Sequence, residues 1–267
     1  MTNSTTRVPA NGEGAQLWNN GNNAILMEEP MIVPRFPRWL WLKSLTDKLA
    51  AAVLLVCSVP FLIVSGVVIK LTSPGPVFYR QKRVGLRGEE FLLYKLRTMI
   101  PNAEAKSGPV WATVHDTRIT PFGAFLRNTH IDELPQLVHV LFAQMSLVGP
   151  RPERPEFVNK LQWEFNHYND RVNVRPGITG LAQILLPPDS TIENVAPKLR
   201  YDLYYVRNAN PWLDLRILFF TGLHAIGQLF SMAGSLFTLP RIDDASTSSW
   251  LDKASRRMST AHRSSLD

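Results

Sequence analysis

The chain has 267 residues, and its 29 Lys and Arg against 22 Asp and Glu give a formal net charge of +7. This balance favours anionic partners such as phosphate-bearing ligands, acidic lipids or nucleic acid, although proteins that face anionic lipid are commonly basic as well. The single cysteine, Cys57, excludes an intrachain disulfide and fits a reducing compartment.

The two ends of the chain lack the apolar runs that a packed core requires. Residues 1–30 are rich in Asn, Gly, Thr and Glu and contain no signal peptide, and the last part of the chain is rich in Ser and Thr. We therefore expect 1–38 to be a disordered N-terminal extension and 241–267 to be a disordered tail.

Residues 49–69 form an uncharged apolar segment of 21 residues. A straight helix of this length would span roughly 30 Å, about the thickness of a bilayer's hydrocarbon core. Ser58 and Pro60 lie near its middle, where the proline removes a backbone donor and predicts a kink. Basic residues flank both ends, which favours placing both ends in the cytoplasm. The residues alone leave two topologies equally open: a helix that spans the membrane, and one that breaks at Ser58–Pro60 and returns.

The rest of the chain predicts an α+β fold that is mostly helical. An interfacial anchor with Trp39 and Trp41 and the membrane segment occupy 39–71, and a small domain follows over 72–240. Residues 77–79 and 91–94 favour two strands joined by a turn at 85–88, and therefore a hairpin. We expect helices over 101–106, 155–168 and 196–208, and a strand over 181–186. The stretch 212–232 is apolar but partly charged, which fits an interfacial helix and nearly as well a packed core helix.

The adjacent acids Asp132 and Glu133 open a segment with helical periodicity. Apolar residues recur at the spacing of one helical face, namely Leu134, Leu137, Val138, Leu141, Phe142 and Met145. Asp132 suits the N-cap, and Pro135 is tolerated in the first turn. Two neighbouring carboxylates can hold a divalent metal and supply an oxygen nucleophile. The alternative is that Asp132 caps the helix and Glu133 complements its dipole.

Basic residues surround this pair in sequence. Arginine binds phosphate in a bidentate manner and lysine adds a point charge, so we take six residues as candidate phosphate ligands: Lys95, Arg97, Arg118, Arg127, Arg151 and Arg175. Because two acids repel phosphate unless a cation intervenes, the pattern predicts Mg²⁺ held by Asp132 and Glu133. A non-catalytic membrane adaptor that binds anionic lipid or a partner protein is the alternative. Nucleic acid is disfavoured because no recognised module interleaves aromatic residues with the charges.

Several motifs in order resemble the bacterial sugar transferases that are monotopic polyprenyl-phosphate phosphoglycosyltransferases. Between about Asp47 and Ile184, the matching pieces after the Ser/Pro-containing apolar segment are residues 75–85, 94–99, 116–120, 126–127, 132–136, 145–152 and 175–180. Each motif is weak alone, and their common order is specific. Two features depart from the family pattern: Ser58 and Pro60 are separated by Val59, and 184–189 reads Ile-Leu-Leu-Pro-Pro-Asp.

The resemblance implies transfer of a phospho-sugar from a UDP-sugar to polyprenyl phosphate, typically undecaprenyl phosphate, with Mg²⁺ and release of UMP. It implies that Asp132 is the nucleophile, that Glu133 helps to hold Mg²⁺, that Arg127 binds phosphate near the lipid and that Arg151 lies near the nucleotide. It also implies a re-entrant helix broken at Ser58–Pro60, a monotopic protein of the bacterial inner membrane, and an active site on its cytoplasmic face. The sugar, the glycoconjugate or exopolysaccharide pathway, and whether the protein forms a homo-oligomer stay open.

Overall fold

The computed structural model describes residues 31–105, 108, 110, 116–186 and 194–226. The unit that begins at Met31 confirms the mostly helical α+β prediction. Its α-helices are α1 (Pro37–Thr72), α2 (Pro121–Asn128), α3 (Leu137–Leu141), α4 (Pro155–Glu164), α5 (Leu181–Leu185), α6 (Val195–Asn208) and α7 (Pro211–Ile226). The strands are β1 (Phe78–Val84), β2 (Glu90–Leu96), β3 (Ser146–Val148) and β4 (Gly177–Thr179). Three 3₁₀ helices are η1 (Leu86–Gly88), η2 (Ile131–Gln136) and η3 (Tyr168–Asn173).

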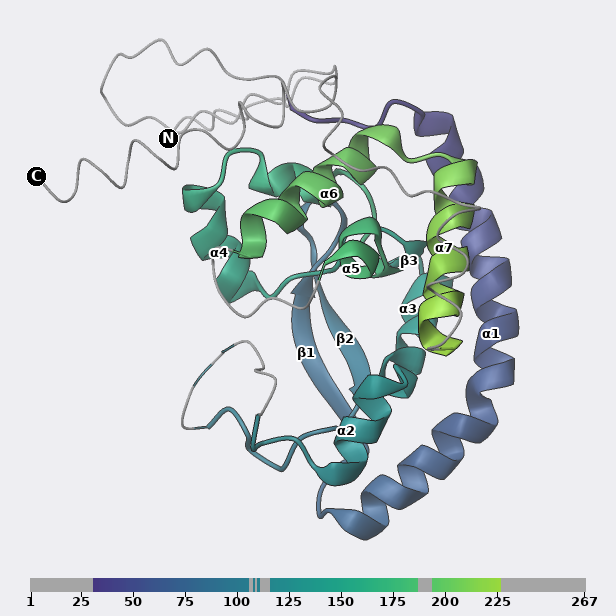
Figure 1. The fold of residues 1–267 in the computed structure, drawn as a ribbon, viewed down its shortest axis with the longest axis vertical. Helices are drawn as coiled ribbons and strands as arrows, with labels where there is room; N and C mark the ends of the chain where they lie inside the picture. The colour runs from purple at the N-terminus through teal and green to yellow at the C-terminus, as the bar shows by residue number, and fades with distance from the viewer. Residues whose placement is uncertain (1–30, 106–107, 109, 111–115, 187–193, 227–267) are drawn as a thin grey trace, which may run out of the picture. The chain divides into compact units, whose positions relative to one another are not determined.

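The long apolar segment lies in α1, a continuous helix of 36 residues. At 1.5 Å per residue it is about 54 Å long, and it is long and apolar enough to cross a membrane. Pro60 lies inside it, so the break predicted at Ser58–Pro60 does not end the helix. The Ser58 hydroxyl donates to the carbonyl of Leu55 at 2.8 Å, and the axis of α1 bends in its C-terminal half (Figure 1). The segment is therefore one bent helix, as expected where a proline removes one backbone hydrogen bond.

The polarity of α1 is inverted relative to a helix of a water-soluble protein. Its buried residues lie on one face at helical spacing and are mostly polar or small: Lys43, Asp47, Ala51, Ser58, Ser65 and Ile69. Its exposed face is apolar and includes Leu49, Val56 and Ile63 at 64 %, 72 % and 61 % exposure. A surface helix in water shows the opposite pattern, so the outer face of α1 has the chemistry of a surface that contacts lipid or another apolar partner.

A buried polar network fastens the N-terminal half of α1 to the domain. Lys43 Nζ lies 3.1 Å from Asp47 Oδ2 and 3.0 Å from Asp214 Oδ2 of α7. Asp47 accepts a hydrogen bond from the hydroxyl of Ser146 at the start of β3, and Tyr205 of α6 donates to Asp214 Oδ1 at 2.7 Å. These polar contacts join α1 to α7 and β3 directly and to α6 through Asp214, so they fix which face of α1 packs on the domain.

The predicted hairpin is confirmed, with longer strands than the sequence indicated. β1 and β2 pair antiparallel from Phe78↔Leu96 to Val84↔Glu90. Leu96 at the end of β2 packs with Ile69 of α1 and Leu126 of α2 in a small apolar cluster. This cluster joins the hairpin to the C-terminal half of α1. The predicted helix at 101–106 is wrong where the structure describes it, because 101–105 form turns.

The strand predicted at 181–186 is wrong, because the structure has α5 there. Two short parallel strands, β3 and β4, form a second sheet elsewhere in the chain. β3 pairs with β4 in the register Ser146↔Gly177 and Val148↔Thr179. The two loops approach closely: a Cβ on Gly149 would lie 2.4 Å from the carbonyl oxygen of Arg175. Only glycine fits this contact, which places the loop after β3 against the turn before β4.

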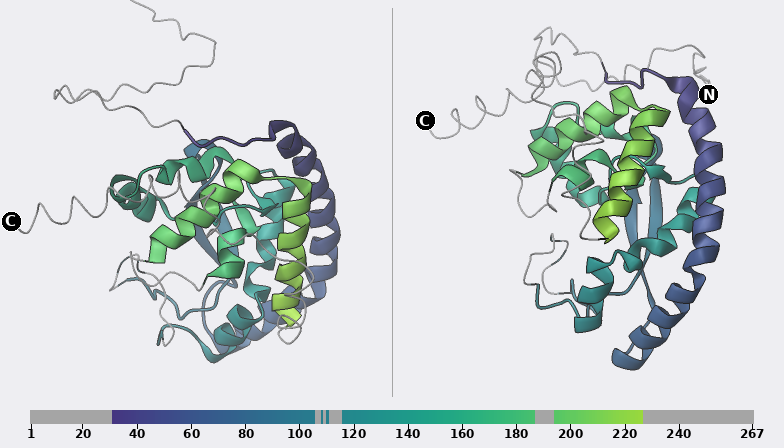
Figure 2. Two further views of the ribbon diagram at one scale, coloured as in Figure 1. Left: turned by 45° about the horizontal axis from the view of Figure 1, so that its top comes forward. Right: turned by 45° about the vertical axis from the view of Figure 1, so that its right-hand side comes forward.

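The helices enclose one main core, to which α3, β3, α5, α6 and α7 contribute Leu137, Leu147, Leu181, Leu203 and Ile217. The expected helices at 155–168 and 196–208 are confirmed as α4 and α6, the first ending at Glu164. α7 runs beside α1 (Figures 1 and 2), with one face in the core. Trp212, Leu215 and Phe219 of α7 are exposed, so it is both a packed helix and the carrier of an apolar surface. Of the two predicted aromatic anchors, Trp41 is 77 % exposed, whereas Trp39 Nε1 donates to Asp214.

Candidate active site

Asp132 and Glu133 lie on η2, not at the N-cap of an α-helix. The N-cap of η2 is His130, which is exposed and has a left-handed backbone with φ 58°. Because η2 begins at Ile131, an α-helix from the same start would need the N–H of residue 135 to donate to Ile131; Pro135 has no N–H, and a tighter 3₁₀ turn forms. α3 begins only at Leu137 and has five residues, which leaves Phe142 74 % exposed instead of buried on the predicted face. The acids are therefore presented by a short 3₁₀ turn that packs against α1 and β2.

Glu133 is the tightly held acid of the pair. Its Oε1 accepts hydrogen bonds from Lys95 Nζ and Arg151 Nη2, each at 2.6 Å, and its Oε2 lies 3.4 Å from Arg151 Nη1. Burial raises the pKa of Glu133, but Arg151 and Lys95 outweigh it and hold that pKa well below its ordinary value. Glu133 is therefore ionised. Three predicted site residues meet here from β2, η2 and the loop after β3.

Asp132 is buried but differs from its neighbour in its partners. Its exposure is 6 %, and it makes no hydrogen bond or ion pair with any other residue that the structure describes. Burial raises the pKa of Asp132, the charges of Lys95 and Arg127 lower it, and Glu133 raises it further, with a net increase. A carboxylate that accepts no hydrogen bond keeps its lone pairs available, which is what a nucleophile requires.

Arg127 and Arg118 contribute differently to this region. Arg127 lies in the last turn of α2, and its Nε donates to the hydroxyl of Thr98 at 2.9 Å. Burial lowers the pKa of Arg127 and the charge of Asp132 opposes that shift, so the guanidinium lies within electrostatic range of the acid. Arg118 instead binds Asp116 through Nε and Nη2 at 2.8 and 2.6 Å, and these hydrogen bonds lower the pKa of Asp116 to about 2. Arg127 belongs to the cluster, whereas Arg118 is paired within its own loop.

The last two candidate phosphate ligands hold backbone turns. Arg97 is 8 % exposed, and its guanidinium donates to the carbonyls of Ser73 and Pro74 at 2.8 and 2.7 Å, directly after α1. Arg175 Nε donates to the carbonyl of Ala143 at 2.8 Å. The structure therefore gives Arg97 and Arg175 structural partners and does not bring them to the acids.

Two residues that the sequence did not single out position the cluster. Thr98 fixes Arg127, as described above. Arg171 donates to the backbone carbonyl of Arg151 at 3.0 Å, while it also binds Asp202 at 2.8 Å and the hydroxyl of Tyr168 at 2.9 Å. Arg171 lies between expected elements, and no spacing rule connects it with Arg151, so only the fold shows its role.

Buried His139 of α3 fastens the hairpin to the segment that carries the acids. The backbone N–H of Tyr94 donates to His139 Nε2 at 3.1 Å, and His139 Nδ1 lies 2.8 Å from Gln144 Oε1. Since Nε2 accepts, the ring is neutral and Nδ1 carries the proton. The imidazole also stacks on the ring of Tyr94 with centroids 5.2 Å apart. This contact holds β2, and with it Lys95, beside η2.

Acid is expected to weaken the fold through His139. Burial lowers the pKa of His139 below its ordinary value of 6.5. The unfolded chain then binds a proton that the folded chain excludes, so the stability from neutral His139 is complete above about pH 6.5 and falls as the pH drops toward the folded pKa, by at most about 1.4 kcal/mol per pH unit. Free energies of unfolding measured at several pH values should show a smaller acid dependence for His139→Gln than for the wild type. Equal slopes would contradict this assignment.

The oxygens at the site fit a hard divalent cation in part. The described residues contain no group of three or more metal-ligating side chains. Mg²⁺, however, needs only one or two carboxylates when substrate phosphates complete its shell. Glu133 Oε2, with a single long contact, and the unpaired Asp132 carboxylate supply such oxygens. The donor set therefore suits Mg²⁺ bound together with a phosphate ligand.

Residues 38–228 match the family model described as "Bacterial sugar transferase". This match covers most of the chain and includes every residue of the cluster. The chain belongs to the bacterial sugar transferase family.

Three named relatives show what the chain is similar to. The chain is 41 % identical over 188 residues to a "UDP-glucose:undecaprenyl-phosphate glucose-1-phosphate transferase" of Xanthomonas campestris pv. campestris, covering 70 % of this chain and 39 % of the relative. It is 40 % identical over 185 residues to a "UDP-N-acetylgalactosamine-undecaprenyl-phosphate N-acetylgalactosaminephosphotransferase" of Aeromonas hydrophila, covering 69 % and 44 %. An "Exopolysaccharide production protein PSS" of Rhizobium leguminosarum bv. phaseoli is 38 % identical over 187 residues, covering 68 % and 94 %. The chain thus spans less than half the length of the first two relatives and nearly all of the third.

Proposed function

We propose that this sugar transferase moves a sugar 1-phosphate from a UDP-sugar to undecaprenyl phosphate, or a related polyprenyl phosphate, and releases UMP. The observation that carries the proposal is the contrast at η2. Asp132 is buried without a partner in the described structure, while the ionised Glu133 beside it is held by Lys95 and Arg151. The substrate class follows that of two relatives, a UDP-glucose and a UDP-N-acetylgalactosamine transferase that act on undecaprenyl phosphate. The reaction would be the first membrane step in making a polysaccharide or glycoconjugate.

The proposed transfer consists of two successive displacements at the same phosphorus. An oxygen of Asp132 attacks the phosphorus that carries the sugar, and the bond from that phosphorus to the oxygen bridging the two phosphates breaks, so UMP leaves. An oxygen of polyprenyl phosphate then attacks the same phosphorus, breaks its bond to Asp132 and yields the polyprenyl diphospho-sugar with free carboxylate. Lys95, Arg127 and Arg151 offset the charge of the phosphates at both steps.

Mg²⁺ is part of the proposal. Bound by Glu133 and Asp132 with substrate phosphate oxygens, it would neutralise phosphate charge and so permit a carboxylate to approach an anionic substrate. Glu133 would hold the ion mainly through Oε2, since Oε1 already binds two cationic side chains.

We also propose that the protein is monotopic in the bacterial inner membrane, with α1 re-entrant and the active site on the cytoplasmic face. The contacts of α1 support this: Lys43 near one end binds Asp214, and Ile69 near the other packs on Leu96, so both ends touch the same domain. A helix crossing the membrane would separate its ends by roughly 30 Å of lipid. The packing of α1 against η2 would place Asp132 near the depth of the acceptor's phosphate.

The covalent step predicts a burst of product without acceptor. Protein in detergent micelles, given Mg²⁺ and a UDP-sugar but no polyprenyl phosphate, should release about one equivalent of UMP and then stop. Adding undecaprenyl phosphate should restore continuous release. A panel of UDP-sugars identifies the donor. If UMP appears only when donor and acceptor are both present, transfer is direct and the aspartyl intermediate is wrong.

A further inference from the structure

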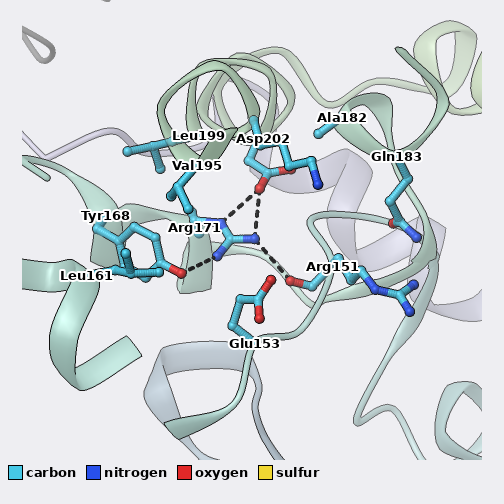
Figure 3. A pocket seen from close by; sticks show the side chains of 11 residues that line it. Arg151, Glu153, Leu161, Tyr168, Arg171, Ala182, Gln183, Val195, Leu199 and Asp202 are labelled. Carbon is cyan, nitrogen blue, oxygen red and sulfur yellow. Dashed lines mark hydrogen bonds and ion pairs between the residues drawn. The ribbon is translucent and has the colours of Figure 1, made fainter. Parts of the chain in front are cut away.

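A pocket lies beside the cluster, between α4, η3, α5, α6 and the loop after β3 (Figure 3). It is a partly open pocket whose empty space, counted together with the open solvent at its mouth, is about 460 Å³. Arg151 lines this pocket and is also the residue whose guanidinium binds Glu133. The pocket and the acid cluster therefore share a residue.

We propose that this pocket binds the ribonucleoside of the sugar donor, and that Glu153 accepts hydrogen bonds from the ribose hydroxyls. The inference rests on the proposed function, because it assigns the nucleoside end of the same substrate. A diphosphate that contacts Arg151 carries its nucleoside one ester bond away. A cavity lined by Arg151 is within that reach.

Glu153 is a carboxylate with unused acceptor capacity. Its side chain is 14 % exposed, and its Oε2 forms an ion pair with Arg83 Nη1 at 3.6 Å, a distance too long for a hydrogen bond. Its side chain accepts no hydrogen bond from another described residue. Its carboxylate points into the pocket toward Arg171 (Figure 3), but Arg171 already donates to Asp202, Tyr168 and the Arg151 carbonyl.

A ribose offers hydrogen-bond donors to the Glu153 carboxylate. Its 2′- and 3′-hydroxyls are neighbouring O–H groups, and a carboxylate accepts from such groups in other nucleotide sites. Glu153 interacts electrostatically with Arg83, Arg151 and Arg171. These three positive charges offset the negative charge of Glu153, so it can lie near a phosphate. The polar side of the pocket is thus suited to a sugar diol next to a phosphate-binding arginine.

The opposite side of the pocket is apolar. Leu161 of α4, Ala182 of α5 and Val195 and Leu199 of α6 line it, together with the ring of Tyr168. Apolar walls with a few convergent polar groups are typical of small-molecule sites. This wall provides a surface for the flat nucleobase, while the polar side meets the ribose.

The test compares UMP with 2′-deoxy-UMP by calorimetric titration of the full-length protein in detergent micelles. We expect the wild type to prefer UMP by about 10-fold or more, because a hydrogen bond to a charged group carries about 1.5–3 kcal/mol. Glu153→Ala should bind the two nucleotides almost equally, and Glu153→Gln should show an intermediate preference. Glu156→Ala, in the first turn of α4 with its side chain 54 % exposed, is the matched control and should retain the wild-type preference.

A second variant tests the apolar wall. Ala182→Leu should fill the pocket and weaken both nucleotides to a similar degree, leaving the preference unchanged. A wild type that binds UMP and 2′-deoxy-UMP equally, or a Glu153→Ala protein that keeps the preference, would overturn the assignment even if UMP release from UDP-sugars is normal. A protein that neither binds UMP nor releases it from any UDP-sugar would overturn the pocket and the proposed function together.

Discussion

Asp132→Asn is expected to reduce UMP release by about 10³-fold or more and to abolish the phospho-sugar adduct. The amide has the size of the carboxylate but no anionic oxygen to attack phosphorus. Asp132 makes no hydrogen bond or ion pair with another described residue, so the change removes no native contact. UMP release and the intact mass of the protein after exposure to a UDP-sugar measure the two effects.

Two comparisons make the Asp132 result specific. Glu90→Gln alters an exposed carboxylate on β2, paired with Lys82 at 3.2 Å, and should leave UMP release close to wild type. Thermal unfolding should show that Asp132→Asn remains folded, since it also removes the repulsion between neighbouring acids. A normal burst of UMP from Asp132→Asn would mean that another group takes the phospho-sugar.

Lys43→Met is expected to lower the free energy of unfolding by about 3–5 kcal/mol, because it leaves two buried carboxylates facing each other without a cation. Lys43, Asp47 and Asp214 are each less than 9 % exposed. Asp214→Asn should cost much less, about 1 kcal/mol, since Lys43 and Asp47 remain a one-to-one pair and the amide oxygen still accepts from Tyr205. Denaturant titration in detergent micelles measures both.

The control for Lys43 lies on the same helix. Lys48 is partly exposed and makes no hydrogen bond or ion pair with another residue in the described part of the chain, so Lys48→Met should change stability by no more than about 0.5 kcal/mol. Equal effects of Lys43→Met and Lys48→Met would show that the buried network does not hold α1 in place.

Local signals in the sequence were sufficient for the hairpin, α4, α6 and the long apolar helix. These elements follow alternation, periodicity and turn residues that act over a few positions. The same signals misplace the helix after the acids: Leu134 to Met145 fit a helical face, but the segment with Pro135 is a 3₁₀ turn and α3 ends at Leu141. β3 and β4 have three residues each, too few for a periodic signal, and exist because Gly149 and Gly177 allow two distant loops to approach.

The sequence groups the charged residues around the acids by type, and the structure shows which of them meet. Residue type identified Glu133, Lys95 and Arg151 as a charged cluster, and the fold brings them within 2.6 Å contacts. Residue type cannot distinguish an arginine that lies beside the acids, as Arg127 does, from one that binds backbone carbonyls, as Arg97 does. Thr98 lies in a matching motif, but its contact with Arg127, like the contact of Arg171 with Arg151, joins residues far apart in sequence and shows only in the fold.

The inverted polarity of α1 assigns attachment to the domain and contact with the surroundings to opposite faces of the helix. Lys43 and Asp47 on its inner face make the polar contacts that fix it to the domain, and side chains such as Leu49, Val56 and Ile63 are exposed on the other face. The outer positions can therefore be rewritten with Glu, Lys and Gln while every contact of the inner face is kept. Preparing a detergent-free form of this protein becomes a problem of surface redesign on α1 and on the exposed apolar positions of α7, with the acid cluster left as it is.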